Sequence, residues 1–330
     1  MKSLITKIRL KPAALAAAVF FTAYTAAACG SDSLSLPEKE ININVIVKKQ
    51  DESFWKVVRM GTEAAAKEFC VNVHFNAPIN EKDIEEQIRL VNEAIDHHAD
   101  AIVLAAGDYL KLVDVTEKAV SANIPVIIID SELNSDKVKS FIATDNVDAG
   151  KKVGETLVKK VGDNCTIAVM SFVKGTATAE QREAGFFEAI SKYPGIEVIS
   201  TEYCNSDEST AEQLTETLVE KYPGMETMVC LNAYGTIGTA RAIEKLGLGG
   251  KIKIIGFDST SEEVSFVEND IIQALVTQNP FSMGYLGVKY AIDAINNKSV
   301  PRYVNTGSTV IDKENMYLPE NQKLVFPFTN

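Results

Sequence analysis

Residues 99–130 read ADAIVLAAGDYLKLVDVTEKAVSANIPVIIID, and this stretch indicates the fold class. It contains two apolar, β-branched strand candidates, AIVLAA (101–106) and PVIIID (125–130), with a segment of helical periodicity between them. Strands that are apolar on both faces, each followed by a helix, are typical of a parallel sheet that helices cover on both sides. We therefore expect an α/β fold.

The same alternation recurs along the chain. Further strand candidates are INVIV (43–47), VNVHF (71–75), SFIATD (140–145), TIAVM (166–170), IEVIS (196–200), METMVCLN (225–232) and KIKIIGF (251–257). Their number exceeds what one small sheet of this class usually holds, so we expect two successive lobes, each a doubly wound parallel sheet. The polar, irregular stretch SELNSDKVKS (131–140) places the break between the lobes near 131–145.

Length and composition fit two soluble lobes. The chain has 330 residues, of which 46% are hydrophobic and 24% charged, and its formal net charge is −12. No cluster of Lys and Arg is present that would neutralise a phosphate backbone, so we expect no nucleic acid as a partner.

The first 28 residues have the layout of an export signal. MKSLITKIRLK (1–11) is basic, and PAALAAAVFFTAYTAAA (12–28) is apolar and ends in small residues directly before Cys29. This resembles a bacterial lipoprotein signal, in which the cysteine becomes the lipidated first residue, although Ala26 stands where Leu is usual. A retained membrane helix and plain secretion are the alternatives. Each outcome places the fold outside the membrane, after a linker at 29–40.

Motifs for cofactor chemistry are missing from the sequence. We find no GxGxxG after the first strand, no GxxxxGK[ST] and no GxSxG, so we expect neither an enzyme nor a cofactor. The cysteines after Cys29 show no CxxC spacing and the three histidines complete no ligand pattern, so we expect no metal. Cys165 and Cys230 lie in strand candidates and are interpreted as small buried hydrophobes, while a disulfide is left unassigned.

Polar and aromatic side chains follow the ends of many strand candidates. Ligands of open parallel sheets bind outside the carboxyl ends of the strands, so these side chains are our candidate site. They are Phe54, Trp55, Asp108, Asp130, Arg182, Asn232, Asp258 and Gln278. Carboxylates, amides and a guanidinium bind hydroxyl groups, and rings cover an apolar face, which predicts a polyhydroxylated ligand.

Each candidate also has a purely structural interpretation. The ring pair is a possible hydrophobic staple, a strand-end aspartate such as Asp108 or Asp258 often caps the next helix, and Arg182 has glutamate neighbours. What favours a site is that these residues recur at the same end of successive strands.

From about residue 41 to 312 the chain resembles the ribose-binding-like sugar-binding proteins of bacterial ABC importers, a type I periplasmic binding protein family. The matching stretches are SFW (53–55), FIATDNVDAGKKVGETL (141–157), GTATAEQREAGF (175–186), IKIIGFDSTSE (252–262) and QALVTQNPFSMGYLGV (273–288). The resemblance implies that Phe54 and Trp55 stack on the sugar. It also implies that Asp108, Arg182, Asn232, Asp258 and Gln278 bind the hydroxyls, and Asp130 is a weaker match at the first crossover.

The resemblance further implies two lobes joined by three crossovers, which we expect near residues 131, 279 and 305. The first lobe would then comprise 38–131 and 280–304, and the second 132–278 and 305–330. In this family, hinge closure traps the ligand, which an ABC transporter permease then receives.

Departures from the family pattern affect the choice of ligand. Lys48 and Glu52 replace small polar and amide residues before the rings, and the helix after residue 80 resembles those of autoinducer-2 and xylose binders. We expect a monosaccharide, with a pentose such as xylose or ribose favoured and an autoinducer-2-type ligand as an alternative. A sugar-sensing lipoprotein that docks on a membrane histidine kinase remains open, whereas the export signal argues against a transcriptional repressor.

Overall fold

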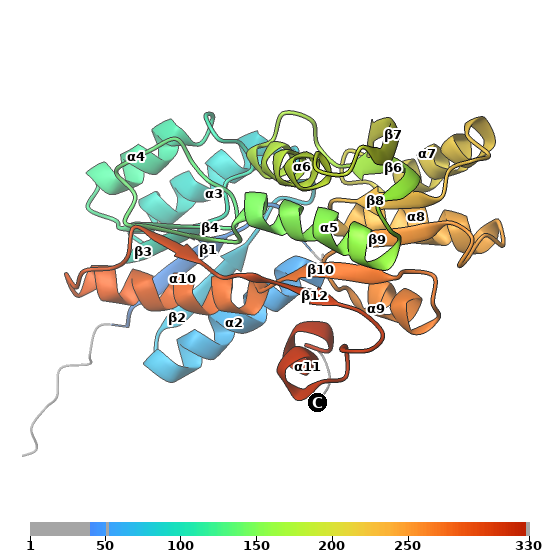
Figure 1. Ribbon diagram of the computed structural model, residues 1–330. Helices are drawn as coiled ribbons and strands as arrows, with labels where there is room; N and C mark the ends of the chain where they lie inside the picture. Colours follow the sequence, from blue (N-terminus) through green and yellow to red (C-terminus); the bar gives the residue numbers. More distant parts are fainter. Residues whose placement is uncertain (1–39, 51–52, 328–330) are drawn as a thin grey trace, which may run out of the picture. The chain divides into compact units, whose positions relative to one another are not determined.

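The computed structural model of the protein describes residues 40–50 and 53–327 (Figure 1). The signal-like segment 1–28, Cys29, residues 30–39 and Glu52 lie outside the described residues. Residues 41–330 form one compact unit. Within the described ranges, no helix is both long and apolar enough to cross a membrane.

The first lobe is built on a sheet of parallel strands in the order β11-β5-β4-β3-β1-β2 (Figure 1). The strands are β1 (Asn42–Ile46), β2 (Asn72–Asn76), β3 (Ala101–Leu104), β4 (Val126–Ile129), β5 (Ser140–Ala143) and β11 (Tyr303–Asn305). Its helices are α2 (Ser53–Phe69), α3 (Ile84–Asp96), α4 (Val113–Ser121) and α10 (Pro280–Ile295).

The second lobe repeats this plan with the order β12-β10-β9-β8-β6-β7, in which only β12 is antiparallel. The strands are β6 (Asn164–Ser171), β7 (Gly195–Tyr203), β8 (Thr227–Cys230), β9 (Lys253–Phe257), β10 (Ala274–Gln278) and β12 (Ser308–Ile311). The helices are α5 (Asn146–Lys160), α6 (Ala177–Ile190), α7 (Glu208–Lys221), α8 (Ala233–Lys245), α9 (Ser261–Glu268) and α11 (Pro319–Val325). The predicted α/β fold with two parallel-sheet lobes is therefore confirmed.

The chain passes between the sheets at three points. It leaves the first sheet after β5, returns between β10 and α10, and leaves again between β11 and β12. The last two passages lie where we expected them, near 279 and 305, but the first does not lie near 131. Ser140 pairs with Ile127 of β4, so the segment 132–143 belongs to the first lobe and the passage falls at Thr144–Asp145.

The core of the first lobe lies on both faces of its sheet. Alternate residues of one strand point to opposite faces: Ile127 and Ile129 pack with α2 and α10, whereas Val126 and Ile128 pack with the α3 and α4 side. All four are buried. The prediction of strands that are apolar on both faces is thereby explained, because helices cover each face.

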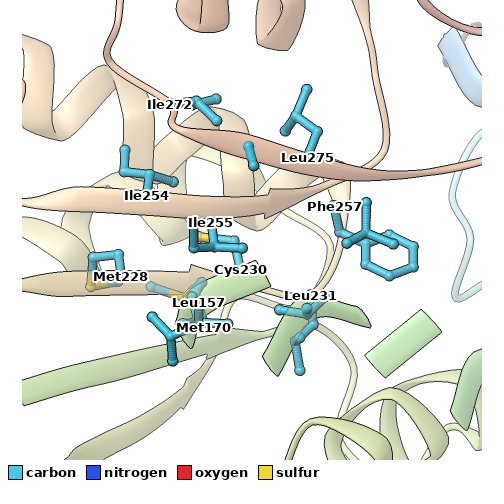
Figure 2. Packing of buried hydrophobic residues seen from close by; sticks show 14 of the residues in the cluster. Leu157, Met170, Met228, Cys230, Leu231, Ile254, Ile255, Phe257, Ile272 and Leu275 are labelled. Carbon is cyan, nitrogen blue, oxygen red and sulfur yellow. The ribbon is translucent and has the colours of Figure 1, made fainter. Parts of the chain in front are cut away.

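The core of the second lobe is one continuous cluster. Figure 2 shows Met170, Met228 and Ile254 from neighbouring strands packed together with Leu157 of α5. Of the cysteines, Cys165, Cys204 and Cys230 are buried free thiols in this cluster, as predicted for Cys165 and Cys230, and Cys70 is an exposed free thiol in the first lobe.

Glycines bring helices of each lobe into backbone contact. A Cβ on Gly61 of α2 would lie 2.1 Å from the Phe281 carbonyl oxygen of α10. Likewise, a Cβ on Gly150 of α5 would lie 2.1 Å from the carbonyl oxygen of Arg182 on α6. Both distances are far below van der Waals contact, so only glycine permits this packing. The second contact fixes the position of Arg182, a predicted site residue.

Candidate functional site

A cavity between the two lobes collects most of the predicted site residues. It is lined by Lys48, Phe54, Trp55, Glu81, Asp130, Phe172, Thr178, Arg182, Ser206, Asn232, Ala233, Tyr234, Asp258 and Gln278. The space among these side chains is partly open to solvent. Of the eight predicted residues, Asp108 alone is missing from this lining.

Arg182 lines the cavity and is 4% exposed. Its Nε donates to Asn146 Oδ1 at 2.9 Å, and its Nη1 donates to the Leu231 carbonyl at 2.8 Å. The guanidinium also stacks 3.9 Å above the Phe257 ring. Burial lowers the pKa of Arg182, which the charges of Asp258 and Asp130 oppose. Within the described residues Nη2 has no hydrogen-bond partner, so it is available to a ligand.

Asp258 follows β9 with a φ of 79°, a left-handed backbone that aspartate tolerates better than most residues. Its Oδ1 accepts from Gln278 Nε2 at 2.8 Å, and its Oδ2 accepts from the Ala233 N–H at 3.2 Å. Burial raises the pKa of Asp258, while the Arg182 charge and these hydrogen bonds act in the opposite direction. The carboxylate is thus oriented before any ligand binds.

Asn232 and Gln278 are held by their own neighbours in the same way. Asn232 caps the N-terminus of α8, where its Oδ1 accepts from the Gly235 N–H at 2.9 Å. Its side-chain amide N–H groups make no hydrogen bond in the part of the chain that the structure describes. Gln278 Oε1 accepts from Thr144 Oγ1 at 2.8 Å, which connects the site to the first passage between the lobes. Both side chains are buried and present amide donors to the cavity.

The aromatic pair comes from the first turn of α2. Phe54 and Trp55 meet edge to face, with ring centroids 4.9 Å apart and an interplanar angle of 86°. Trp55 is 5% exposed and packs in the core of the first lobe. Trp55 thus both packs in the core of the first lobe and lines the cavity.

Lys48 and Asp130 form a buried ion pair in the cavity. Lys48 Nζ lies 2.8 Å from Asp130 Oδ2, and the two side chains are 10% and 9% exposed. Ser131 Oγ contacts both partners. Burial disfavours the ammonium of Lys48, but Asp130 and Glu81 outweigh it, so the pKa of Lys48 is raised. Asp130 Oδ1 has no hydrogen-bond partner among residues 40–50 and 53–327, so it is available to a ligand.

Asp108 does not line this cavity, so its predicted ligand contact stays a prediction. Its carboxylate accepts from the backbone N–H groups of Leu110 and Lys111, at 2.9 and 2.8 Å, and these bonds help to lower its pKa against the effect of burial. The Asp108 carboxylate therefore stabilises its own loop, but it does not cap the next helix, α4, whose N-cap is Leu112.

Several lining residues were not among the predicted ones. Lys48 was noted as a departure but not assigned to the site, and Glu81, Phe172, Ser206 and Tyr234 were not singled out. Phe172 directly follows β6, and Tyr234 lies two residues after Asn232. Both could therefore have been predicted by examining the residues that follow each strand. Glu81 and Ser206 come from loops that no local pattern connects to the cleft.

The cavity offers hydrogen-bond donors and acceptors in similar measure. Arg182, Asn232, Gln278 and Lys48 present N–H groups, whereas Asp130 and Asp258 present carboxylate oxygens. The two buried cations are matched by two buried carboxylates. A neutral ligand with several hydroxyl groups satisfies both sets, because each hydroxyl donates once and accepts twice.

The comparisons with known proteins agree with this geometry. A family model described as "Periplasmic binding protein domain" matches residues 43–299. The D-allose-binding periplasmic protein of Escherichia coli (strain K12) is 27% identical over 258 residues, which are 76% of this chain and 83% of that protein. The ribose import binding protein of Bacillus subtilis (strain 168) is 24% identical over 268 residues, or 81% and 86% of the two chains.

Solved structures give the same result. An ABC transporter solute binding protein from Agrobacterium vitis, with bound D-fucose, is 32% identical with a TM-score of 0.82; the match spans 86% of this chain and all (100%) of that one. A carbohydrate transporter solute binding protein from Agrobacterium radiobacter, in complex with D-arabinose, is 29% identical with a TM-score of 0.83, over 87% and 99% of the chains. The chain therefore belongs to the periplasmic binding protein family, in the branch that contains the ribose- and allose-binding proteins.

Proposed function

We propose that this protein binds a neutral monosaccharide in the cavity between its lobes and delivers it to an ABC importer. The observation that carries the proposal is the convergence of two rings with a charge-balanced set of buried donors and acceptors. The relatives named above bind ribose or allose, and the similar structures hold D-fucose or D-arabinose.

Binding requires groups from both lobes. Phe54, Trp55, Lys48 and Asp130 come from the first lobe, and Arg182, Asn232, Asp258 and Gln278 from the second. A ligand that touches both sets stabilises the arrangement in which the lobes are close, so hinge closure follows as a shift of population toward that arrangement. The passages at 144–145, 279 and 306–307 would act as the hinge.

Lys48 and Asp130 are proposed to set which sugar fits. A buried pair with donors and one available carboxylate oxygen can bind adjacent hydroxyls, and its bulk limits the room at that end of the cavity. A pentose such as xylose or ribose remains our first choice for this reason, with D-allose as the hexose to compare.

A thermal-shift screen tests the proposal. D-ribose, D-xylose, D-arabinose, D-allose, D-fucose and autoinducer-2 are added separately to the purified chain that starts at Gly30. At 100 times Kd a ligand stabilises the folded state by about 2.7 kcal/mol, which is a readily measured shift in melting temperature. We expect a shift with at least one monosaccharide, and none with the same sugar for Arg182→Met. No shift with any of these sugars would contradict the proposal.

Delivery to an importer is tested in cells. Deleting the gene should abolish uptake of the radiolabelled sugar identified in the screen, and the wild-type gene should restore it. Uptake that persists while a sugar-dependent transcriptional response is lost would instead support the sensor that docks on a membrane histidine kinase.

Anchoring at Cys29 is a separate proposal, supported by the small residues directly before it and the basic start of the chain. Lipidation would keep the binding lobes at the outer side of the cell membrane. Labelling with a palmitate analogue, compared between the wild type and Cys29→Ala, measures it; label on both proteins would contradict it.

A further inference from the structure

One side-chain contact joins the lobes at a distance from the passages between them. Lys49, which follows β1 in the first lobe, donates from Nζ to the hydroxyl of Tyr234 at 2.9 Å, and Nζ lies 4.6 Å from the centroid of the same ring. Tyr234 belongs to the first turn of α8 in the second lobe. The other side-chain hydrogen bonds between the lobes, within the described ranges, lie at the passages. Examples are Thr144 Oγ1 to Gln278 Oε1 and the Asp145 N–H to Asn305 Oδ1.

The two partners have different relations to the ligand cavity. Tyr234 lines the cavity, whereas Lys49 does not. Beside the cavity lies a second hollow, which is lined by Lys49, Gln50, Ser53, Glu208, Ala233, Tyr234, Ile237 and Thr260. Tyr234 and Ala233 line both spaces, so Tyr234 lies where the ligand cavity and the second hollow adjoin.

The backbone on each side of the contact is held by site residues. Lys48, one residue before Lys49, is fixed by its ion pair with Asp130. Tyr234 follows Ala233, whose N–H donates to Asp258, and α8 is capped by Asn232. The contact therefore reports the distance between the two halves of the site, and it breaks when the halves separate.

Opposite charges on the two lobes also favour contact between them near Lys49. The pKa of Asp207, at the start of α7 in the second lobe, is lowered by hydrogen bonds from Thr210 and also by Lys49 and Lys82 of the first lobe. Two lysines of the first lobe thus attract a carboxylate of the second lobe, which favours approach of the lobes.

We propose that Lys49 and Tyr234 form a latch that holds the lobes closed over the bound ligand and sets how long the ligand stays. The inference rests on the proposed function, because it assigns a kinetic role at the same site. A contact present only in the closed arrangement stabilises that arrangement alone, so it slows ligand release without changing the encounter with the open protein.

Stopped-flow measurement of D-ribose and D-allose release, followed by Trp55 fluorescence, tests the latch. Lys49→Met removes the charge but keeps an apolar stem, and Tyr234→Phe removes the hydroxyl but keeps the ring. Each should raise the dissociation rate constant about two- to tenfold, the usual effect of losing one hydrogen bond, and leave the association rate constant unchanged. Lys56→Met, at an exposed position of α2, is the matched control and should leave both rate constants unchanged.

The double variant separates a latch from two independent effects. If the residues act together, Lys49→Met with Tyr234→Phe releases the sugar no faster than either single variant. Additive effects would overturn the proposal. The proposal would also be overturned if Tyr234→Phe raised the dissociation rate constant and Lys49→Met left it unchanged. The phenol of Tyr234 would then act by direct contact with the sugar.

A second measurement does not depend on any sugar. Spin labels on the exposed native Cys70 and on Glu220→Cys in α7 report the separation of the lobes, since the other described cysteines are buried. We expect Tyr234→Phe to increase the population with longer distances in ligand-free protein. An unchanged distance distribution would overturn the latch. If the latch is found but none of the screened monosaccharides binds, the proposed function fails while the inference about the lobes stands.

Discussion

The two lobes place an aspartate at the same point of their folds but surround it differently. Asp130 follows β4 and Asp258 follows β9, the fourth strand that each lobe contributes along the chain, and both have left-handed φ angles, 62° and 79°. Asp130 is neutralised by the ammonium of Lys48. Asp258 is instead held by an amide and a backbone N–H, and the charge of Arg182 opposes the rise of its pKa.

The two lobes therefore contribute differently to ligand binding. In the second lobe, Arg182, Asn232, Asp258 and Gln278 are each fixed by at least one hydrogen bond to the protein, so their free atoms are aimed before the ligand arrives. The first lobe contributes rings and one ion pair. We infer that the second lobe orients the ligand and the first lobe covers it. Two variants test this division, and a third tests a buried carboxyl group of the second lobe.

The largest effect is expected from Asp258→Asn, which keeps the shape of the side chain but removes its charge. Removing the charge of this buried carboxylate, whose partners in the protein are Gln278 and the Ala233 N–H, should weaken D-ribose or D-allose binding by about 2–5 kcal/mol, measured by calorimetry. Asp163→Asn, an exposed position of the same lobe, is the control and should bind normally. Equal affinity of the Asp258 variant and the wild type would show that the second lobe does not orient the ligand through this residue.

A smaller effect is expected from Trp55→Ala in the first lobe. Loss of ring stacking should weaken binding by about 1–3 kcal/mol, and the cavity left in the core should lower the free energy of unfolding by about 3–5 kcal/mol. Phe69→Ala, at the far end of α2, should lose stability but retain sugar affinity. Trp55→Phe should recover most of the binding. If Trp55→Ala binds as tightly as the wild type, the ring serves the core alone.

The smallest effect on binding is expected from Glu263→Gln in α9, a buried residue of the second lobe. Burial, and then the charge of Asp258, raise the pKa of Glu263 well above its ordinary value. The folded state therefore holds this proton more tightly than the unfolded state. The stability that it contributes is complete below the ordinary glutamate pKa and is lost as pH rises through the raised pKa.

The variant removes this titration and keeps an oxygen for the Thr260 N–H in the capping box. Its melting temperature should exceed that of the wild type by an amount that grows with pH, on the order of a few degrees. Asp258, whose pKa is also raised, should leave part of the pH slope in place. If the melting temperatures of the two proteins change with pH in the same way, Glu263 is not the group responsible for this loss of stability.

Much of the architecture followed from local patterns. Apolar, β-branched runs gave strands at positions such as β3 and β4, because a strand covered by helices on both faces must be apolar on both. The same logic predicted seven of the residues that line the cavity, since the carboxyl ends of parallel strands meet at one edge of each sheet. These features depend on side-chain type and order along the chain, which the sequence states directly.

The first passage between the lobes could not be located in this way. SELNSDKVKS looks like a linker, yet the strand that follows it pairs with β4 and extends the first sheet. Which strand a buried segment pairs with depends on long-range contacts that leave no local signature.

The two parallel-sheet lobes could be predicted from the sequence, because periodicity and composition indicate which faces are buried. The chemical groups at the strand ends could also be predicted, because residue type and order are given by the sequence. The hydrogen-bond and ion-pair partners of those groups depend on the tertiary structure. It turned Asp108 toward its own loop, paired Lys48 with Asp130, and brought Lys49 within reach of Tyr234. Such contacts join residues far apart in the chain, and their formation depends on the orientation of whole strands and lobes.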